Sequence, residues 1–545
     1  MKEHIREGSM AGSRVSGSAP RTRWWGASAL AGVAAAVVAA TVLPAGGAQA
    51  TGAGMRVPAR YAQQRLDWQP CEGASSLECA RMTVPRDWHR PDAGVDLTVA
   101  VSRHRANNPA ARRGVLMMAA GGPGASGLNR PEGFVKDEPA VGAAYDVVSF
   151  DQRGVGRSTR PVCQTDAEFR EFFAHDFRDR SHAAVQGVLA RSRKLAQDCQ
   201  ARSGGLLPYL TTEQTARDMD LYRSLLGARK ISYYGPSYAT MIGAYYATLF
   251  PRRIERTVLD SNVGWAGSWE EFETGQPKSF QRRFEQDFLP WLAKYDTVRH
   301  YGRTAQQAKA RWEARRRALA EHPVTVGQVV IGPNQLDNGT IQAIYNAKEG
   351  FPVLASALAA LDHGDGAGAP ERQLMEKVFG SYLSPEFLAE YFSVTCNDTA
   401  WNRDIDYWVR RSAKDTKTQP LVGARDLAFS SVCAYWPTAT APKVKVTGAG
   451  LPTTLMLNSV HDPATYYEAA VRDHRALRGS RLVTVTGGGD HGQYRNGNAC
   501  VDDIVTTYLL TGKAPKHDTT CAAGPLPVPA GPAAKTGLSP ERRSS

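Results

Sequence analysis

The residues best suited to chemistry begin with the segment Gly235-Pro236-Ser237-Tyr238-Ala239. It follows the apolar run ISYY and precedes an apolar helical stretch, which is the strand–turn–helix context of a nucleophile elbow. Small residues suit such a turn, because it holds the serine in a strained conformation between a crowded strand and helix. Ala239 stands where glycine is usual, and one added methyl group is tolerable there. The segment predicts Ser237 as a nucleophile.

A serine hydroxyl is a weak nucleophile, so a histidine base and an orienting acid must accompany it. His491 lies in GGGDHGQY, just after the apolar run RLVTV, and matches the serine–acid–histidine order of such sites. Asp462, in TLMLNSVHDPAT, follows another apolar run and is the expected acid. Two rivals remain open. Asp260 ends the run IERTVL, and Asp490 adjoins His491, although an adjacent residue points elsewhere along the backbone.

Backbone N–H groups are needed to stabilise the negative charge that develops on an attacked carbonyl oxygen. Tyr238, directly after the nucleophile, is expected to supply one of them. The segment Gly121-Gly122-Pro123-Gly124, which follows the run GVLMMAA, is expected to supply the other. Glycines allow a close approach because no Cβ intervenes. A plain turn is the alternative interpretation of the same glycines.

The elements that must position these residues are short apolar runs separated by helix-like segments. This pattern is typical of a parallel sheet that is buried on both faces. The runs span residues 95–103, 114–120, 144–150, 231–234, 254–259, 451–457 and 481–485. They predict a doubly wound α/β fold.

The pattern breaks in the second half of the chain, where charged and aromatic helical segments replace the apolar runs. We therefore expect five parts, which are a signal peptide at 1–50, a first part of the sheet domain at 51–263, a helical lid at 264–442, a C-terminal part of the sheet domain at 443–522 and a disordered tail at 523–545. The tail is expected to be disordered because it is rich in Pro, Ala and Gly.

The N-terminus has the pattern of an export signal. A basic stretch ends at Arg23, an apolar run follows from Trp24 to Leu43, and Ala48-Gln49-Ala50 provides a cleavage site. A membrane anchor is the alternative, but the run is rich in Ala and Gly and ends in small residues. We expect cleavage, secretion, and no stable membrane insertion afterwards.

Composition excludes several classes of protein. Of 545 residues, 42% are hydrophobic and 22% are charged, which is typical of a globular chain. The formal net charge is +13, yet the basic residues outside the N-terminal stretch are interspersed with acids. A solvated basic surface, without a nucleic-acid partner, is therefore expected. We also expect a monomer.

The eight cysteines fall into four near pairs, which suits an oxidising compartment. Nearest-neighbour pairing would join Cys71 to Cys79, Cys163 to Cys199, Cys396 to Cys433, and Cys500 to Cys521. The spacings are not those of zinc ligands, so neither a metal nor another cofactor is predicted.

Taken together, the motifs resemble those of the exported tripeptidyl aminopeptidases, in the prolyl-aminopeptidase branch of the α/β-hydrolases. The motifs are GGPGASG, YDVVSFDQRGVGRS, YYGPSYAT, VTCNDT, CAYWP, HDPAT and DHG, and they cover most of the chain from about Cys71 to Cys521. The resemblance implies Ser237, Asp462 and His491 as a catalytic triad, with Gly122 and Tyr238 as oxyanion donors. It also implies that residues 151–154 form a structural loop beside the site.

The implied activity is release of short peptides, often tripeptides, from a free N-terminus. Such an enzyme needs an anion to hold the substrate ammonium group, and a helical lid that shapes the pocket. Candidate carboxylates in the expected lid are Glu270, Glu271, Glu273, Glu349 and Asp398, with Asp398 favoured because it lies in VTCNDT. Asp490 departs from the family pattern, in which a glycine usually precedes the histidine. A carboxylate there is expected to raise the pKa of His491.

Two other functions stay open. A triad does not distinguish an amide from an ester, so a secreted carboxylesterase or lipase on the same fold is the first alternative. An apolar lid pocket would favour it, whereas an acidic one would favour peptides. A non-catalytic binding protein on a hydrolase scaffold is the second, although the presence of Ser, Asp and His together argues against it.

Overall fold

The computed structural model describes residues 57–380 and 383–529. The predicted signal peptide and the predicted tail from residue 530 onward lie outside the described residues.

A ten-stranded sheet is the framework of the fold, with the strand order β1-β2-β3-β5-β4-β6-β7-β10-β11-β12. Its strands are β1 (Gln69–Cys71), β2 (Ala74–Pro85), β3 (Asp96–His104), β4 (Gly114–Met118), β5 (Tyr145–Phe150), β6 (Ile231–Pro236), β7 (Ile254–Asp260), β10 (Thr454–Ser459), β11 (Arg481–Thr486) and β12 (Thr519–Ala522). The pairs from β1 to β5 are antiparallel. Those from β5 to β12 are parallel. The predicted α/β class is confirmed.

Both faces of the central strands are buried, which explains their uninterrupted apolar sequences. In β4, Val115 and Met117 join one core with helices α1 (Ala59–Ala62), α6 (Thr212–Leu225), α7 (Ala239–Leu249) and α19 (Tyr467–Ala476). Leu116 and Met118 join the opposite core with α2 (Arg130–Asp137), α3 (Pro139–Ala144) and α20 (Ala499–Thr511). The sheet is therefore the middle of three layers.

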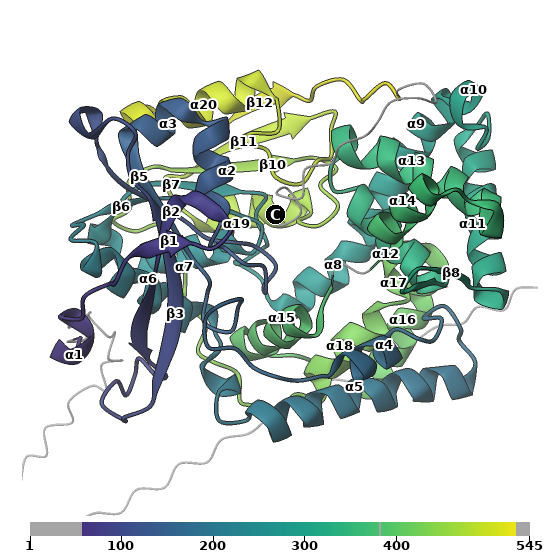
Figure 1. Cartoon of the computed structure of the whole chain (residues 1–545), viewed down its shortest axis with the longest axis horizontal. Helices are drawn as coiled ribbons and strands as arrows, with labels where there is room; N and C mark the ends of the chain where they lie inside the picture. The colour runs from purple at the N-terminus through teal and green to yellow at the C-terminus, as the bar shows by residue number, and fades with distance from the viewer. Residues whose placement is uncertain (1–56, 381–382, 530–545) are drawn as a thin grey trace, which may run out of the picture. The chain divides into compact units, whose positions relative to one another are not determined.

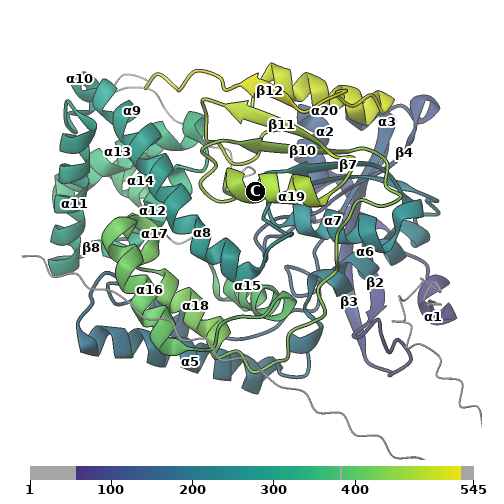
Figure 2. The same ribbon diagram turned by 180° about the vertical axis from the view of Figure 1, so that it is seen from behind.

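Beside the sheet lies a set of helices that we call the helical region. Its members after β7 are α8 (Trp269–Arg282), the π-helical turn η4 (Arg283–Phe288), α9 (Leu289–Lys294), α10 (Asp296–Arg299), α11 (Ala305–Glu321), α12 (Pro333–Ala343), α13 (Ala347–His363), α14 (Ala369–Phe379), α15 (Pro385–Asp398), α16 (Ile405–Thr418), α17 (Pro420–Gly423) and α18 (Asp426–Ala434). A small hairpin, β8 (Val324–Val326) and β9 (Val329–Ile331), interrupts them. Helices α8 and α15 lie between the sheet and the other helices (Figures 1 and 2).

Two helices from the first half of the chain also belong to this region. α4 (Asp166–Phe172) and α5 (His182–Ser203) share an apolar core with α15, α16 and α18. α5 runs along one side of the helical region in both views (Figures 1 and 2). The expected boundary at residue 264 therefore does not enclose the whole helical region, because α4 and α5 lie before it.

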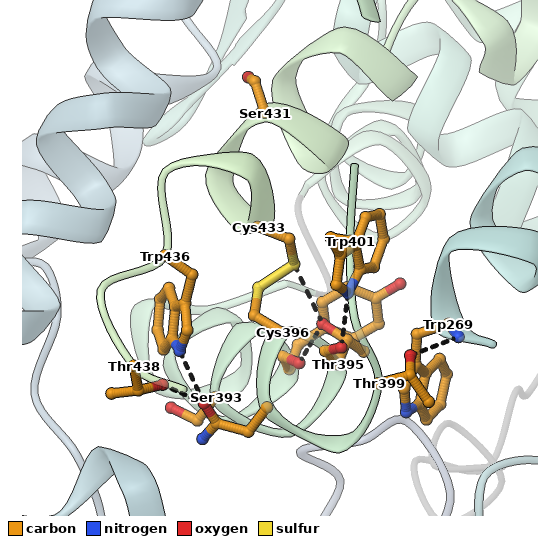
Figure 3. Close-up of a disulfide and its surroundings, with 12 residues drawn as sticks. Trp269, Ser393, Thr395, Cys396, Thr399, Trp401, Ser431, Cys433, Trp436 and Thr438 are labelled. Carbon is orange, nitrogen blue, oxygen red and sulfur yellow. Dashed lines mark hydrogen bonds between the residues drawn. A yellow bond between two sulfur atoms is a disulfide. The ribbon is translucent and has the colours of Figure 1, made fainter. Parts of the chain in front are cut away.

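All eight cysteines form nearest-neighbour disulfides, Cys71–Cys79, Cys163–Cys199, Cys396–Cys433 and Cys500–Cys521. The Cys396–Cys433 bond joins α15 to α18, and the backbone carbonyl of Thr395 beside it accepts a hydrogen bond of 2.8 Å from the Trp401 indole (Figure 3). Disulfides form and persist in oxidising compartments.

Within the described ranges, no helix combines the length and the apolar character needed to cross a membrane.

Candidate active site

Ser237 lies in the sharp turn between β6 and α7 and has φ 58°, a left-handed conformation that is rare for a residue with a side chain. Its backbone N–H donates to the Asp260 carbonyl at 2.8 Å. Close packing explains the small neighbours, since a Cβ on Gly235 would lie 2.8 Å from the Ala239 carbonyl oxygen. The turn therefore holds Ser237 in the strained geometry of a nucleophile elbow.

His491 and Asp462 meet in a fully buried pair, as their positions after β11 and β10 predict. Nδ1 of His491 lies 3.0 Å from one Asp462 oxygen and 3.1 Å from the other. Among the described residues, the opposite ring nitrogen, Nε2, is buried and has no hydrogen-bond partner. The imidazole is thus oriented at one end and available at the other.

Thr465 completes this pair, and sequence reasoning did not single it out. Its hydroxyl donates to Asp462 at 2.9 Å and lies 3.2 Å from His491 Nδ1. The backbone N–H groups of Ala464 and Thr465 bind the other Asp462 oxygen at 2.9 and 2.8 Å. The motif HDPAT is therefore a turn wound around the carboxylate, which the spacing of Asp462 and Thr465 could have indicated.

The pKa of His491 is shifted by opposing causes. Burial alone would lower it, but the nearby carboxylates of Asp462 and Asp260 favour the imidazolium and raise the pKa above its ordinary value. Asp490, expected to have this effect, instead faces the guanidinium of Arg283. The side chain of Asp490 therefore points away from its neighbour along the chain.

Asp260, the rival acid, does not contact the imidazole. Its carboxylate accepts hydrogen bonds from the backbone N–H groups of Gln493 and Tyr494 at 2.8 and 3.0 Å. The Tyr234 hydroxyl donates to it at 3.1 Å. Since its carbonyl also binds the N–H of Ser237, Asp260 joins the nucleophile turn to the histidine loop.

The glycine segment after β4 lies against the nucleophile. A Cβ on Gly121 would be 3.0 Å from Cβ of Ser237, and Gly122 has φ 107°, which favours glycine. In the chain that the structure describes, the N–H groups of Gly122 and Tyr238 donate to no protein acceptor. Helix α15 lies close to this segment, because a Cβ on Gly122 would lie 3.4 Å from the Phe387 ring and a Cβ on Gly124 would lie 2.8 Å from the Phe387 carbonyl oxygen.

The loop after β5 supports this glycine segment. Asp151 accepts hydrogen bonds from the Ser126 hydroxyl at 2.6 Å and the Gly127 N–H at 2.9 Å. Arg153, fully buried, forms two bonds of 2.7 Å with Asp218. These contacts are those of a structural loop beside the site.

Three of the predicted ammonium-binding carboxylates have structural contacts in the helical region. Glu270 accepts the Asn402 N–H at 2.6 Å, and Glu271 caps the start of its own helix and is largely exposed. Asp398 accepts the N–H of Thr212 at 2.9 Å, the Thr212 hydroxyl at 2.5 Å and the Trp269 indole at 3.4 Å. Both of its oxygens are occupied, so Asp398 joins α15 to the start of α6.

Three other carboxyl groups are buried without such contacts. Glu273, Glu390 and Asp426 are at most 4% exposed, and each has a buried oxygen that accepts no hydrogen bond from any described residue. Burial raises the pKa of Glu273 to about 7, against the opposing field of Arg425. Burial likewise raises the pKa of Glu390 and of Asp426 well above the ordinary value.

The last two of these were missed in the sequence. Glu390 is a lone acid within the apolar stretch FLAEYF, and this contrast was the available signal. Asp426 opens α18 and reads as an ordinary helix-start acid.

Glu273 belongs to the face of α8 that lies towards the segments after β6, β10 and β11, which carry Ser237, Asp462 and His491 and which we call the catalytic loops. On this face Trp269 packs against Tyr238, with ring centroids 5.9 Å apart. Gln276 donates to the Ala464 carbonyl at 2.8 Å, and Phe280 contacts Tyr345, whose ring lies edge-on to His491. Residues 269, 273, 276 and 280 recur at helical spacing, so Glu273 shares this face.

No cluster of His, Cys, Asp and Glu that could hold a metal ion occurs among residues 57–380 and 383–529.

A mostly parallel sheet of this strand order, with a strained serine after a central strand and an Asp–His pair after later strands, defines an α/β-hydrolase. A family model described as "TAP-like protein" matches residues 419–521. The tripeptidyl aminopeptidase of Streptomyces lividans is 35% identical over 488 residues, covering 86% of this chain and 89% of that protein. Over that extent the chain belongs to the tripeptidyl aminopeptidase family, as its motifs predicted.

More distant relatives have other names. Serine protease Hip1 of Mycobacterium tuberculosis is 28% identical over 516 residues, covering 89% of this chain and 96% of that protein. Carboxylesterase B of the same species is 31% identical over 505 residues, covering 88% of this chain and 94% of that protein. The predicted enzyme class, a hydrolase, is confirmed.

Proposed function

We propose that the protein is a secreted serine exopeptidase that releases short peptides, with tripeptides as the main product, from free N-termini. The observation that carries the proposal is the His491 imidazole, held by Asp462 at Nδ1 and left without a protein partner at Nε2. His491 takes the proton from the Ser237 hydroxyl, and Ser237 attacks the scissile carbonyl. His491 passes that proton to the leaving amine of the shortened chain as the C–N bond breaks, and the released peptide remains as an ester on Ser237. A water molecule that His491 activates then hydrolyses this ester and frees the Ser237 hydroxyl.

The oxyanion of each tetrahedral intermediate binds to the N–H groups of Gly122 and Tyr238. Both groups are available, since neither donates to a protein acceptor in the described chain. Asp462 keeps the proton of His491 on Nδ1 and stabilises the imidazolium that forms during attack. Thr465 and the two backbone donors fix the orientation of that carboxylate.

We assign the substrate ammonium group to Glu273 and Asp426. These carboxyl groups interact electrostatically inside the helical region, and each keeps an oxygen without a protein donor. A buried carboxylate is costly unless a cation or hydrogen-bond donor pairs with it. A peptide's α-ammonium group supplies a positive charge and several N–H donors. An acetylated N-terminus is neutral and supplies one N–H donor.

The tripeptide length sets a requirement on this assignment. An extended tripeptide spans about 10 Å, so a group that binds its ammonium must lie roughly that far from Ser237. Glu273 lies one turn of α8 beyond Trp269, whose ring packs against Tyr238, the residue after Ser237.

The proposal of secretion rests on the N-terminal pattern together with the four disulfides.

The test compares two chromogenic tripeptide amides, one with a free N-terminus and one acetylated, with Ser237→Ala as the control enzyme. We expect cleavage of the free form alone, and a loss of turnover of about 10⁴-fold or more in Ser237→Ala. Equal cleavage of both amides would contradict the exopeptidase assignment. Cleavage of simple p-nitrophenyl esters but of neither amide would favour an esterase, as the name of one relative suggests.

A further inference from the structure

Arg283 opens the π-helical turn η4 at the end of α8 and is buried to 1% exposure. Its guanidinium lies 4.9 Å from the centre of the Phe351 ring, and its Nε donates to the Ile344 carbonyl at 3.1 Å. A π-helical turn inside an α-helix is uncommon and frequently occurs at functional sites. Arg283 is the first residue of this turn, and its guanidinium reaches Asp490 in the loop that follows β11.

The two remaining nitrogens of Arg283 bind carboxylates beside two of the catalytic loops. Nη2 donates to Asp490, the residue before His491. Nη1 donates to Asp287 at 2.8 Å, and Asp287 accepts a hydrogen bond of 3.0 Å from His461, the residue before Asp462. One guanidinium thus connects the residues that precede both members of the acid–histidine pair.

The surroundings leave this cluster little freedom. A Cβ on Gly489 would lie 2.7 Å from Nη1 of Arg283 and 2.7 Å from the His461 backbone oxygen. Asp490 also accepts hydrogen bonds of 2.9 Å from the Ala347 N–H and the Asn496 amide. The contacts define one arrangement of the two loops relative to η4.

We propose that Arg283 is a positioning residue for the hydrolytic reaction, which sets the geometry of the Asp462–His491 pair and cancels the charge of Asp490 beside it. The inference rests on the roles proposed above for Ser237, Asp462 and His491. It makes assembly of the triad depend on docking of a helical-region residue against the sheet domain.

The electrostatic part follows from the groups that face His491. Asp462 and Asp260 already favour its imidazolium form. Asp490 and Asp287 lie further from the imidazole, and the guanidinium of Arg283 offsets their charge. His461 hydrogen-bonds Asp287. Within this cluster, loss of Arg283 would leave an uncompensated carboxylate adjacent to His491, which further favours the imidazolium and raises its pKa.

The experiment measures kcat/KM against pH for p-nitrophenyl acetate, a small ester that does not use the ammonium site. The acid limb of this profile is the range in which protonation of His491 reduces kcat/KM. In Arg283→Met we expect its midpoint to lie about 0.5–1 pH unit higher than in the wild type, from Coulomb energies at an effective dielectric constant of about 20. We also expect kcat to fall about tenfold or more, because small displacements of catalytic groups are costly. Arg283→Lys keeps the positive charge but loses the planar guanidinium that binds two carboxylates at once. Its acid limb should therefore lie at the wild-type position, while kcat stays reduced.

The double variant Arg283→Met/Asp490→Asn removes both charges, and its acid limb should return towards the wild-type value. The matched control is Arg316→Met, because Arg316 is also a buried arginine between two aspartates, Asp176 and Asp337, but lies away from the triad. It should lower stability without moving the acid limb. An unchanged limb in a folded Arg283→Met would overturn the proposal.

If Arg283→Met fails to fold, Asp490→Asn decides the question. With Arg283 retained, its acid limb should move down by a few tenths of a pH unit. No change in limb or kcat would overturn the proposal. A wild-type protein without turnover dependent on Ser237 would refute the proposed function itself, and the role of Arg283 with it.

Discussion

Two buried carboxylates of the helical region differ from those of the sheet domain in what surrounds them, whereas Asp398 of the same region is fully hydrogen-bonded. In the sheet domain, Asp462, Asp260 and Asp473 each accept two or more hydrogen bonds from backbone N–H groups. In the helical region, Glu273 and Asp426 have buried oxygens without a protein donor. The first group stabilises the fold, whereas the second retains binding capacity that a ligand can use. On the proposed function, the first group holds the loops after β7, β10 and β11, and the second binds the substrate ammonium group.

The largest effect should come from a substitution among the carboxylates of the sheet domain that accept backbone hydrogen bonds. Asp462→Asn replaces an oxygen that accepts the His491 proton with an amide that donates one, so the wrong tautomer of His491 is favoured. We expect kcat to fall about 10³- to 10⁴-fold with little change in KM. Steady-state kinetics on the free tripeptide amide measure this loss. Retention of most of the activity would assign the acid role to another residue.

A substitution of a carboxyl group that has an oxygen without a protein donor should change KM. Glu273→Gln removes a charge that pairs with the substrate ammonium group, and we expect KM for the free tripeptide amide to rise about 10- to 100-fold, as a buried charged hydrogen bond is worth about 1.5–3 kcal/mol. Turnover of p-nitrophenyl acetate should be unaffected. Glu271→Gln, a change on the exposed side of the same helix, is the control. Equal effects of the two substitutions would contradict the assignment.

The same assignment predicts a pH dependence of binding. Because burial raises the pKa of Glu273 to about 7, the carboxylate that binds an ammonium group is only partly formed in weak acid. KM for the free tripeptide amide should therefore fall about fivefold between about pH 6 and about pH 7.5, and at higher pH the substrate's own ammonium group, with a pKa of about 7.7–8.0, loses its proton. The ester should show no such trend. A KM that is independent of pH would mean that Glu273 does not contact the substrate charge.

The smallest effects concern stability and should have opposite signs. Burial raises the pKa of Asp473 and of Glu273 alike to about 7, so the two form a matched pair. For both, the raised pKa means that stability is complete below the unfolded-state value near 4 and is lost as pH rises to about 7. Glu273→Gln removes an unpaired charge and should raise the free energy of unfolding at pH 8 by about 1–2 kcal/mol.

Asp473→Asn should instead lower the free energy of unfolding at pH 8 by about 1–2 kcal/mol. The substitution replaces one of the two oxygens that accept hydrogen bonds from the N–H groups of Gly264, Trp265 and Ala266. Urea unfolding of the two variants at about pH 5 and about pH 8 measures both signs. A destabilised Glu273→Gln at pH 8 would place Glu273 among the structural carboxylates.

The same contrast between the two regions limits what the sequence reveals. Central strands such as β4 are buried on both faces and read as unbroken apolar runs, so their positions were predictable. β2 was not predicted, although Ala80, Met82 and Val84 alternate with exposed Arg81 and Thr83, because one face of this strand is polar. The turn at Ser237 and the Asp462–His491 pair could be predicted because each of these residues lies shortly after such a run.

Contacts in the helical region depend on packing between distant segments, which periodicity does not encode. α5 packs against α18, and Asp426 interacts with Glu273 although more than a hundred residues separate them. Asp490 illustrates the same limit. Its proximity to His491 in the sequence suggested a direct electrostatic effect, but the partner that determines its orientation, Arg283, lies in another part of the chain.

The order of the proposed catalytic residues along the chain has a consequence for the order in which they are synthesised. The nucleophile turn follows β6, whereas the acid and the histidine follow β10 and β11, beyond most of the helical region. During synthesis the nucleophile therefore emerges long before its base, and a chain that ends ahead of β10 contains a serine with no means of activation. Hydrolytic competence arrives only when the last strands join the sheet edge. The topology therefore places the proposed acid and base in the last part of the sheet domain to be synthesised, so Ser237 gains both only when β10 and β11 are in place.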